Sequence, residues 1–216
     1  MKAERNPQLS VPQKINKVGR VFCAKFLDRE VAQESGASNF IAGRWIFVAS
    51  ANHALVIEWR TGRFQHIRTE LLDGKASMSA CTLPISGCVA IGGNDGVIRV
   101  WNLAKSAIIA KLSGPHLKSA ITGLAASGWT LMSGSSDGTV CLWDIRKEAP
   151  LSSNAITKAH NSVTEIAAGS KGFISLGSEK QAIVWNENGR ERLKAKLPIK
   201  PWAAAAMADG SFAVRT

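Results

Sequence analysis

Short apolar runs alternate with turn residues along this chain in a regular order. Between residues 120 and 159 the runs cover 120–126, 130–134, 139–145 and 154–159. Runs of this length that are rich in Val, Ile, Trp and Thr, and that Gly, Ser and Asp interrupt, predict β-strands. We therefore expect four strands in this stretch and an all-β fold.

The four-strand unit recurs along the sequence with a period of 42 residues. The tryptophans Trp59, Trp101, Trp143 and Trp185 follow one another at that interval. The blocks around them read SANHALVIEWRT, GGNDGVIRVWNL, GSSDGTVCLWDI and LGSEKQAIVWNE. Four strands in a period of about 40 to 45 residues predict one blade of a β-propeller in each period.

The block that ends in Trp143 and Asp144 resembles the WD40 repeat family. In that family a hydrogen-bonded tetrad ties each blade together, because buried His, Ser and Trp polar groups need partners. The resemblance implies two such structural tetrads, His116 with Ser133, Asp137 and Trp143, and His160 with Ser175, Glu179 and Trp185.

The repeat departs from the family pattern at several positions. Lys180 replaces the turn glycine of the last tetrad. The blade of Trp101 has Ile91 where the hydroxyl is expected, and no histidine precedes its first strand. The blade of Trp59 keeps the tryptophan but has His53 in the turn. The repeat therefore weakens toward the N-terminus.

Two regions are expected along the chain. Residues 1–20 form a basic segment that we expect to be mobile, and residues 21–216 form blades that start near residues 21, 78, 120, 162 and 202. This gives four blades and a half, whereas closed propellers typically have between four and eight complete blades. The ring is therefore expected to be completed by further sequence, by a partner or by self-association.

Composition narrows the setting in which the chain works. The four cysteines form no Cys-x-x-Cys pair and all lie in predicted strands, which favours a reducing, intracellular setting, cytoplasmic with the nucleus as the alternative, and no bound metal. The first residues carry no apolar signal core, and no apolar run approaches the ~18 residues of a membrane helix.

Positive charge is in excess, with 27 Lys and Arg against 16 Asp and Glu, a net charge of +11. In the WD40 arrangement, the turns that join blades and the turns between second and third strands line one face. The resemblance places a ring of lysines on that face: Lys75, Lys118, Lys158, Lys180 and Lys200. Such a ring favours acidic protein segments, and RNA phosphates or anionic lipid head groups are alternative partners.

No grouping of nucleophile, base and orienting residue stands out, and no glycine-rich loop leads into a helix, so we expect neither an enzyme nor a cofactor. The WD40 resemblance implies a protein-interaction scaffold. The blocks GRWIFVASANHALVIEW, VAIGGNDGVIRVWNL and LMSGSSDGTVCLWDI are also similar to the N-terminal propeller of the large WD40 subunit of the plant TPLATE (TSET) adaptor complex. This similarity implies a vesicle-trafficking role. The alternative is a component of an RNA-protein assembly.

Overall fold

The computed structural model describes residues 21–26, 45–50, 53–58, 64–68, 77–83, 87–102, 105, 107–116, 118–147, 149–150, 156–207 and 209–216. The predicted basic segment 1–20, Trp59 and Lys75 lie outside these residues. Every regular element in the described part of the chain is a β-strand. No helix there has the length and apolarity needed to span a bilayer.

The first two sheets are four-stranded antiparallel meanders, in which each strand pairs with the next strand along the chain. The first sheet contains β1 (Val21–Phe26), β2 (Trp45–Ser50), β3 (His53–Glu58) and β4 (Phe64–Arg68). The second contains β5 (Ser77–Thr82), β6 (Cys88–Gly93), β7 (Ile98–Asn102) and β8 (Ala107–Leu112).

The third and fourth sheets repeat this order, but the outer strand of the third sheet is divided. The third sheet contains β9 (Ile121–Ser127), β10 (Thr130–Ser135), β11 (Thr139–Asp144), and the short β12 (Ala149–Pro150) and β13 (Ile156–Lys158), which both pair with β11. The fourth contains β14 (Val163–Gly169), β15 (Gly172–Gly177), β16 (Gln181–Trp185) and β17 (Glu191–Lys196). A two-stranded sheet of β18 (Ala203–Ala206) and β19 (Phe212–Arg215) follows.

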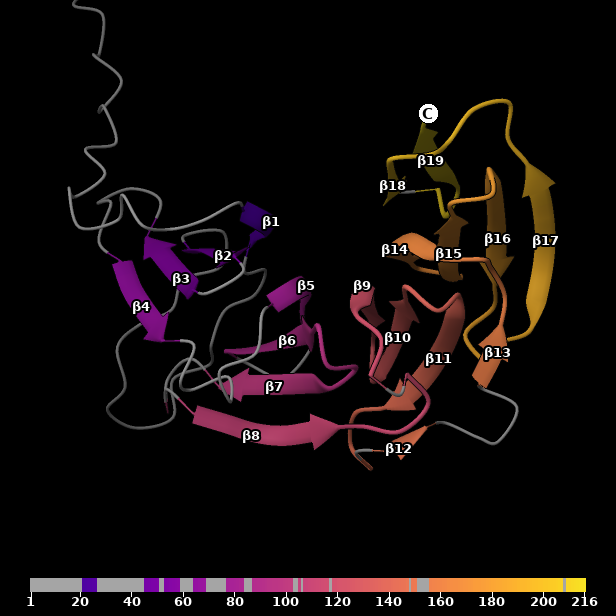
Figure 1. Cartoon of the computed structure of the whole chain (residues 1–216). Helices are drawn as coiled ribbons and strands as arrows, with labels where there is room; N and C mark the ends of the chain where they lie inside the picture. The colour runs from indigo at the N-terminus through magenta and orange to yellow at the C-terminus, as the bar shows by residue number, and fades with distance from the viewer. Residues whose placement is uncertain are drawn as a thin grey trace, which may run out of the picture.

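The five sheets follow one another around an open arc (Figure 1). The first strands of successive sheets lie side by side toward the centre, since β1 contacts β5, β5 contacts β9, β9 contacts β14 and β14 contacts β18. The outer strands β4, β8 and β17 lie on the outside, and the arc is open between the first and last sheets. This is the arrangement of propeller blades in a ring that is not closed.

The hydrophobic core lies between successive sheets. Leu112 and Ile121 come from the second and third sheets and are fully buried in one cluster with Trp143. A second cluster joins the third sheet to the fourth and contains Phe173 and Trp185. Burial of a large apolar side chain contributes about 1.5 to 3 kcal/mol, so each blade depends on its neighbours for much of its stability.

Side-chain hydrogen bonds also join neighbouring sheets. Each runs from a hydroxyl on one inner strand to a backbone oxygen on the next, 41 or 42 residues further along. These bonds are Ser79 Oγ to Ile121 O at 2.7 Å, Thr122 Oγ1 to Val163 O at 2.6 Å and Ser127 Oγ to Gly169 O at 3.2 Å. The inner strands therefore form a connected framework.

Candidate interaction face

The fourth sheet contains a continuous chain of four hydrogen-bonded side chains. His160 Nδ1 lies 2.5 Å from Glu179 Oε1, and His160 Nε2 lies 2.8 Å from Ser175 Oγ. Trp185 Nε1 donates to Ser175 Oγ at 2.8 Å. Because an ionised carboxylate only accepts, the proton of neutral His160 is on Nδ1, and Nε2 accepts from the Ser175 hydroxyl. Every member of the chain then has a partner.

The protonation states of His160 and Glu179 are set by their burial and by the hydrogen bond between them. Burial lowers the pKa of His160, and the bond to Glu179 offsets that effect only in part. Burial raises the pKa of Glu179, but the bonds from His160 and from Asn161 N outweigh it, so the net pKa is lowered. Near neutral pH the imidazole is therefore neutral and the carboxylate ionised, which suits a structural role.

The third sheet differs from the expected pattern at Asp137. His116 Nε2 lies 2.7 Å from Ser133 Oγ, which also accepts from Trp143 Nε1 at 2.7 Å. The Asp137 carboxylate instead accepts from Thr139 N in its own turn at 2.7 Å, and His116 Nδ1 is buried without a partner. Burial lowers the pKa of His116 to about 4, although the charge of Asp137 opposes this.

The second sheet replaces the tetrad with an ion pair. Arg99 is 4% exposed and binds Asp95 through two contacts, Nη2 to Oδ2 at 2.7 Å and Nη1 to Oδ1 at 3.1 Å. Burial raises the pKa of Asp95, but the pairing with Arg99 and the backbone bonds in the turn, among them that from Val97 N, together outweigh it, so the net pKa is lowered. Trp101 Nε1 is buried without a partner, as expected where Ile91 replaces the serine.

Sequence reasoning missed Arg99. The repeat contains a signal for this residue. Arg99 lies 42 residues before Cys141 and 84 before Ile183, and both of these equivalent strand residues are buried, so Arg99 should be buried too. A buried arginine requires a carboxylate, and Asp95 is four residues away.

Four of the five predicted lysines are described, and all four are exposed. Lys118 lies between β8 and β9, Lys158 ends β13, Lys180 lies in the turn between β15 and β16, and Lys200 lies between β17 and β18. In a four-stranded antiparallel meander, the start of the inner strand, the turn between strands two and three, and the end of the outer strand share one end of the sheet. These four lysines therefore lie on one face, which we call the basic face.

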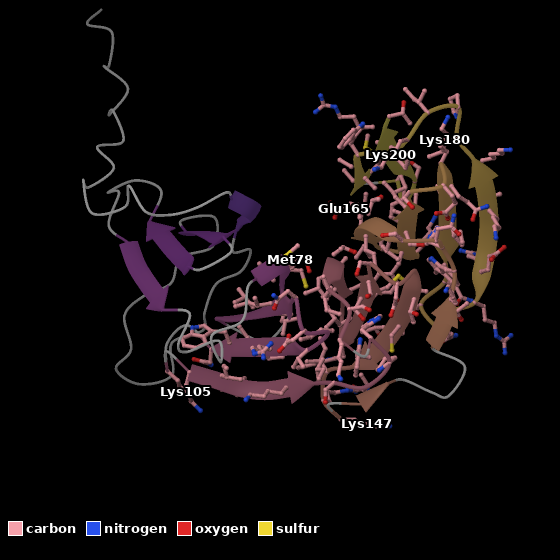
Figure 2. All side chains as sticks on the ribbon, viewed as in Figure 1. Met78, Lys105, Lys147, Glu165, Lys180 and Lys200 are labelled. Atoms are coloured by element: carbon pink, nitrogen blue, oxygen red, sulfur yellow. The ribbon has the colours of Figure 1, made fainter. Side chains whose placement is uncertain are left out.

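Two other exposed lysines mark the opposite face. Lys105 lies between β7 and β8, and Lys147 follows β11, so both belong to connections between third and fourth strands. Figure 2 shows them far from Lys180 and Lys200, which lie in the region of β16 to β19. Trp129 also lies in a turn at this opposite end, 46% exposed, with the Arg146 guanidinium 5.9 Å from its ring centroid.

Residues 107–144 match the family described as "WD domain, G-beta repeat". This stretch of the chain is similar to a WD40 repeat. The match runs from β8 through β11 and ends one residue after Trp143, so it contains Ser133 together with the two side chains hydrogen-bonded to it, His116 and Trp143.

Solved structures extend the likeness beyond this one WD40 repeat. A chain in the structure titled "Crystal Structure of Mitotic Checkpoint Complex" aligns with a TM-score of 0.69 at 16% identity. The alignment covers 79% of the present chain and 53% of the other, so it spans about half of that protein's length. No curated protein matches the chain.

These comparisons establish the fold and leave the function open. As many as 1360 chains of solved structures match, so the likeness does not select one activity among them. The matched stretch and the repeated sheets around it form an all-β propeller framework.

Proposed function

We propose that this chain is a non-catalytic scaffold that binds other proteins through its basic face. The observation that carries the proposal is that three successive junctions between sheets each place a lysine at the same end of the sheets. These lysines are Lys118, Lys158, Lys180 and Lys200. A rigid surface with repeated positive charge attracts acidic protein segments and speeds their association. Binding of this kind weakens as the salt concentration rises.

Two of the described histidines support a framework role over a catalytic one. His116 and His160 are buried inside the blades, and burial lowers the pKa of both. Within the described residues, no three metal-binding side chains lie together. The polar chemistry of these blades is thus directed at its own fold.

A finer assignment is a vesicle-adaptor or coat-type subunit working in the cytoplasm. Its support is the similarity of the tryptophan blocks to the propeller of the plant adaptor subunit. The alternative is a component of an RNA-protein assembly, in which the same lysines contact phosphates. Both alternatives use the basic face, so they differ in what is bound and not in where.

Affinity purification from nuclease-treated extract at moderate salt tests the proposal. The tagged protein is recovered and its companions are identified by mass spectrometry. We expect a defined set of proteins that survives the nuclease and is released by high salt, with adaptor or coat subunits among them if the finer assignment holds. Loss of every companion on nuclease treatment would support the RNA alternative and contradict the protein scaffold.

A further inference from the structure

The outer strand of the fourth sheet has one free edge. β17 pairs with β16 alone and lies on the outside of the arc (Figure 1). Contacts between neighbouring sheets run mainly through first and second strands, as between β9 and β14 and between β10 and β14. A further sheet packed in the same way would leave the outer edge of β17 uncovered, so this edge does not depend on how the ring is completed.

The register of the sheet shows which backbone groups of β17 point toward the free edge. Leu197 N donates to Lys180 O at 2.7 Å, and the register of β16 and β17 is continuous over the adjoining pairs. Hydrogen-bonded and non-bonded pairs alternate along an antiparallel ladder. Ala195 therefore also bonds to β16, whereas Lys194 and Lys196 direct their N–H and C=O groups outward, where an extended chain can pair with them.

The same strand carries a row of exposed cations. Lys194 and Lys196 alternate on one face, about 6.8 Å apart along the strand, and Arg192 continues the row at a register shift. Lys194 lies opposite Ile183, which is buried against the third sheet. In agreement with this, the charge of Lys194 contributes to lowering the pKa of His160, which lies between the third and fourth sheets. The row thus faces the third sheet and not the two-stranded fifth.

The equivalent strand of the second sheet has fewer charges on this face. There Lys111 lies opposite Arg99, the counterpart of Ile183, and the position two residues earlier is Ile109 where β17 has Arg192. A charged side chain protects an edge strand from pairing with other chains, and β8 does this with one lysine. Among the described residues, none of the three cations of β17 forms an ion pair. Their charge is therefore open to a partner.

Charge and backbone geometry decide between the possible occupants of this edge. A second copy of β17 would place like charges opposite one another, which destabilises the pairing. Residues 1–20 contain five Lys and Arg against one Glu and would be repelled in the same way. Single-stranded RNA binds by stacking its bases on aromatic rings, and β17 has none. An acidic peptide matches both the cations and the outward backbone groups.

We propose that an acidic protein segment binds in extended conformation along β17, as an additional strand of the fourth sheet. Its backbone pairs with the N–H and C=O groups of Lys194 and Lys196, and its alternate Glu or Asp side chains face Arg192, Lys194 and Lys196. In strand addition, backbone bonds supply affinity and alternate side chains supply specificity. We call this surface the cationic edge. It runs along an outer strand and is separate from the basic face, so it goes beyond the proposed function.

The test is fluorescence anisotropy with a labelled peptide of about seven residues in which Glu and Val alternate. One control peptide has Gln in place of Glu, and another has the same composition with its Glu residues grouped together. The alternating acidic peptide should bind wild type best. A variant with Arg192→Gln, Lys194→Gln and Lys196→Gln should bind it about tenfold or more weakly. All three side chains are exposed, so this edge variant should melt like wild type.

A matched variant controls for the loss of charge. It carries Lys105→Gln, Lys147→Gln and Lys171→Gln, three exposed lysines away from β17. Its net charge equals that of the edge variant, and it should bind the peptide like wild type. Equal weakening in both variants would mean that the peptide responds only to overall charge, which contradicts the cationic edge.

Backbone pairing provides a second readout. Methylating the backbone nitrogens of one alternate set of peptide residues should abolish binding, whereas methylating the other set should leave it nearly unchanged. Amide hydrogen exchange at Lys194 and Lys196 should slow in the complex. The N–H of Ala195 should change little, because it already bonds to β16.

Three results would overturn the proposal. The first is that wild type does not bind the alternating peptide. The second is that both methylated peptides bind equally, and the third is that a single-stranded RNA oligonucleotide binds the three cations while the peptide does not. Loss of peptide binding in the basic-face variant but not in the edge variant would also contradict it and leave the proposed function standing. Loss in the edge variant alone, with slowed exchange at Lys194 and Lys196, supports it.

Discussion

Glu179 and His160 are joined by a 2.5 Å hydrogen bond, whereas Asp137 makes no such bond to His116 one repeat earlier. The longer Glu side chain reaches the imidazole, while the Asp137 carboxylate accepts from Thr139 N within its own turn. The complete tetrad thus lies in the repeat that matches the family pattern less well.

This difference predicts unequal costs for removing the two carboxylates. Glu179→Ala leaves the buried His160 Nδ1–H without an acceptor, which should lower the free energy of unfolding by about 1 to 3 kcal/mol. Asp137→Ala removes a turn acceptor and should cost about 1 kcal/mol. Urea unfolding of both variants measures the difference, with Glu179→Gln as a control that keeps an acceptor. A larger cost for Asp137→Ala would contradict the described bonding.

The buried histidines predict a loss of stability in mild acid. Burial lowers the pKa of His116 from 6.5 to about 4 and also lowers that of His160. Below pH 6.5 the unfolded chain binds protons that the folded protein does not, so the free energy of unfolding falls as the pH falls. We expect His116 alone to contribute about 2 kcal/mol of loss between pH 7 and pH 5.

Urea titrations at pH 7, 6 and 5 measure this slope, and His116→Gln should reduce it. The range stops at pH 5 because carboxyls with lowered pKa values, including Glu179 and Asp95, lose their own stabilisation only below about pH 4.5. Equal slopes for wild type and His116→Gln would mean that His116 is not held neutral by the fold.

The tryptophans of the second and third sheets should respond differently to the same substitution. Trp143→Phe removes a donor from Ser133 Oγ, whereas Trp101→Phe removes an indole N–H that has no partner. Both rings are 1% exposed, so their packing losses should be similar. We expect Trp101→Phe to be less destabilising by about 1 to 2 kcal/mol in urea unfolding. Equal costs would indicate an acceptor for Trp101.

Lys180→Gly should stabilise the fold. It relieves a φ of 63° in a residue with a Cβ, and although glycine adds entropy to the unfolded chain, the free energy of unfolding should rise by up to about 1 kcal/mol. The control is Gly138→Ala, which should destabilise strongly because its Cβ would meet His160 O. A lower melting temperature for Lys180→Gly would contradict this interpretation of the turn.

Much of the fold could be predicted because it depends on local patterns that repeat. The 42-residue spacing of tryptophans reflects one sheet per period, and the strands predicted at 130–134 and 139–145 correspond to β10 and β11. The outer strand expected at 154–159 instead comprises β13 and the additional β12. The short strands β12 and β13 are held by their pairing with β11 and carry little apolar pattern of their own.

The site was less predictable because it depends on contacts between distant residues. The pairing of Arg99 with Asp95 follows from which face of β7 is buried, and the split of roles between Asp137 and Glu179 follows from side-chain reach. Neither follows from the repeat alone, which aligns Arg99 with Cys141 and Asp137 with Glu179.

The central claim is that the basic face binds the companion proteins. It is tested most directly by repeating the nuclease-treated purification with wild type and with one variant that carries four charge reversals, Lys118→Glu, Lys158→Glu, Lys180→Glu and Lys200→Glu, and comparing the proteins recovered. The melting temperatures of the two proteins are compared first, because exposed lysines should contribute little to stability. The account predicts that the variant is folded and loses the salt-sensitive companions. Recovery of the same companions by a folded variant would contradict it.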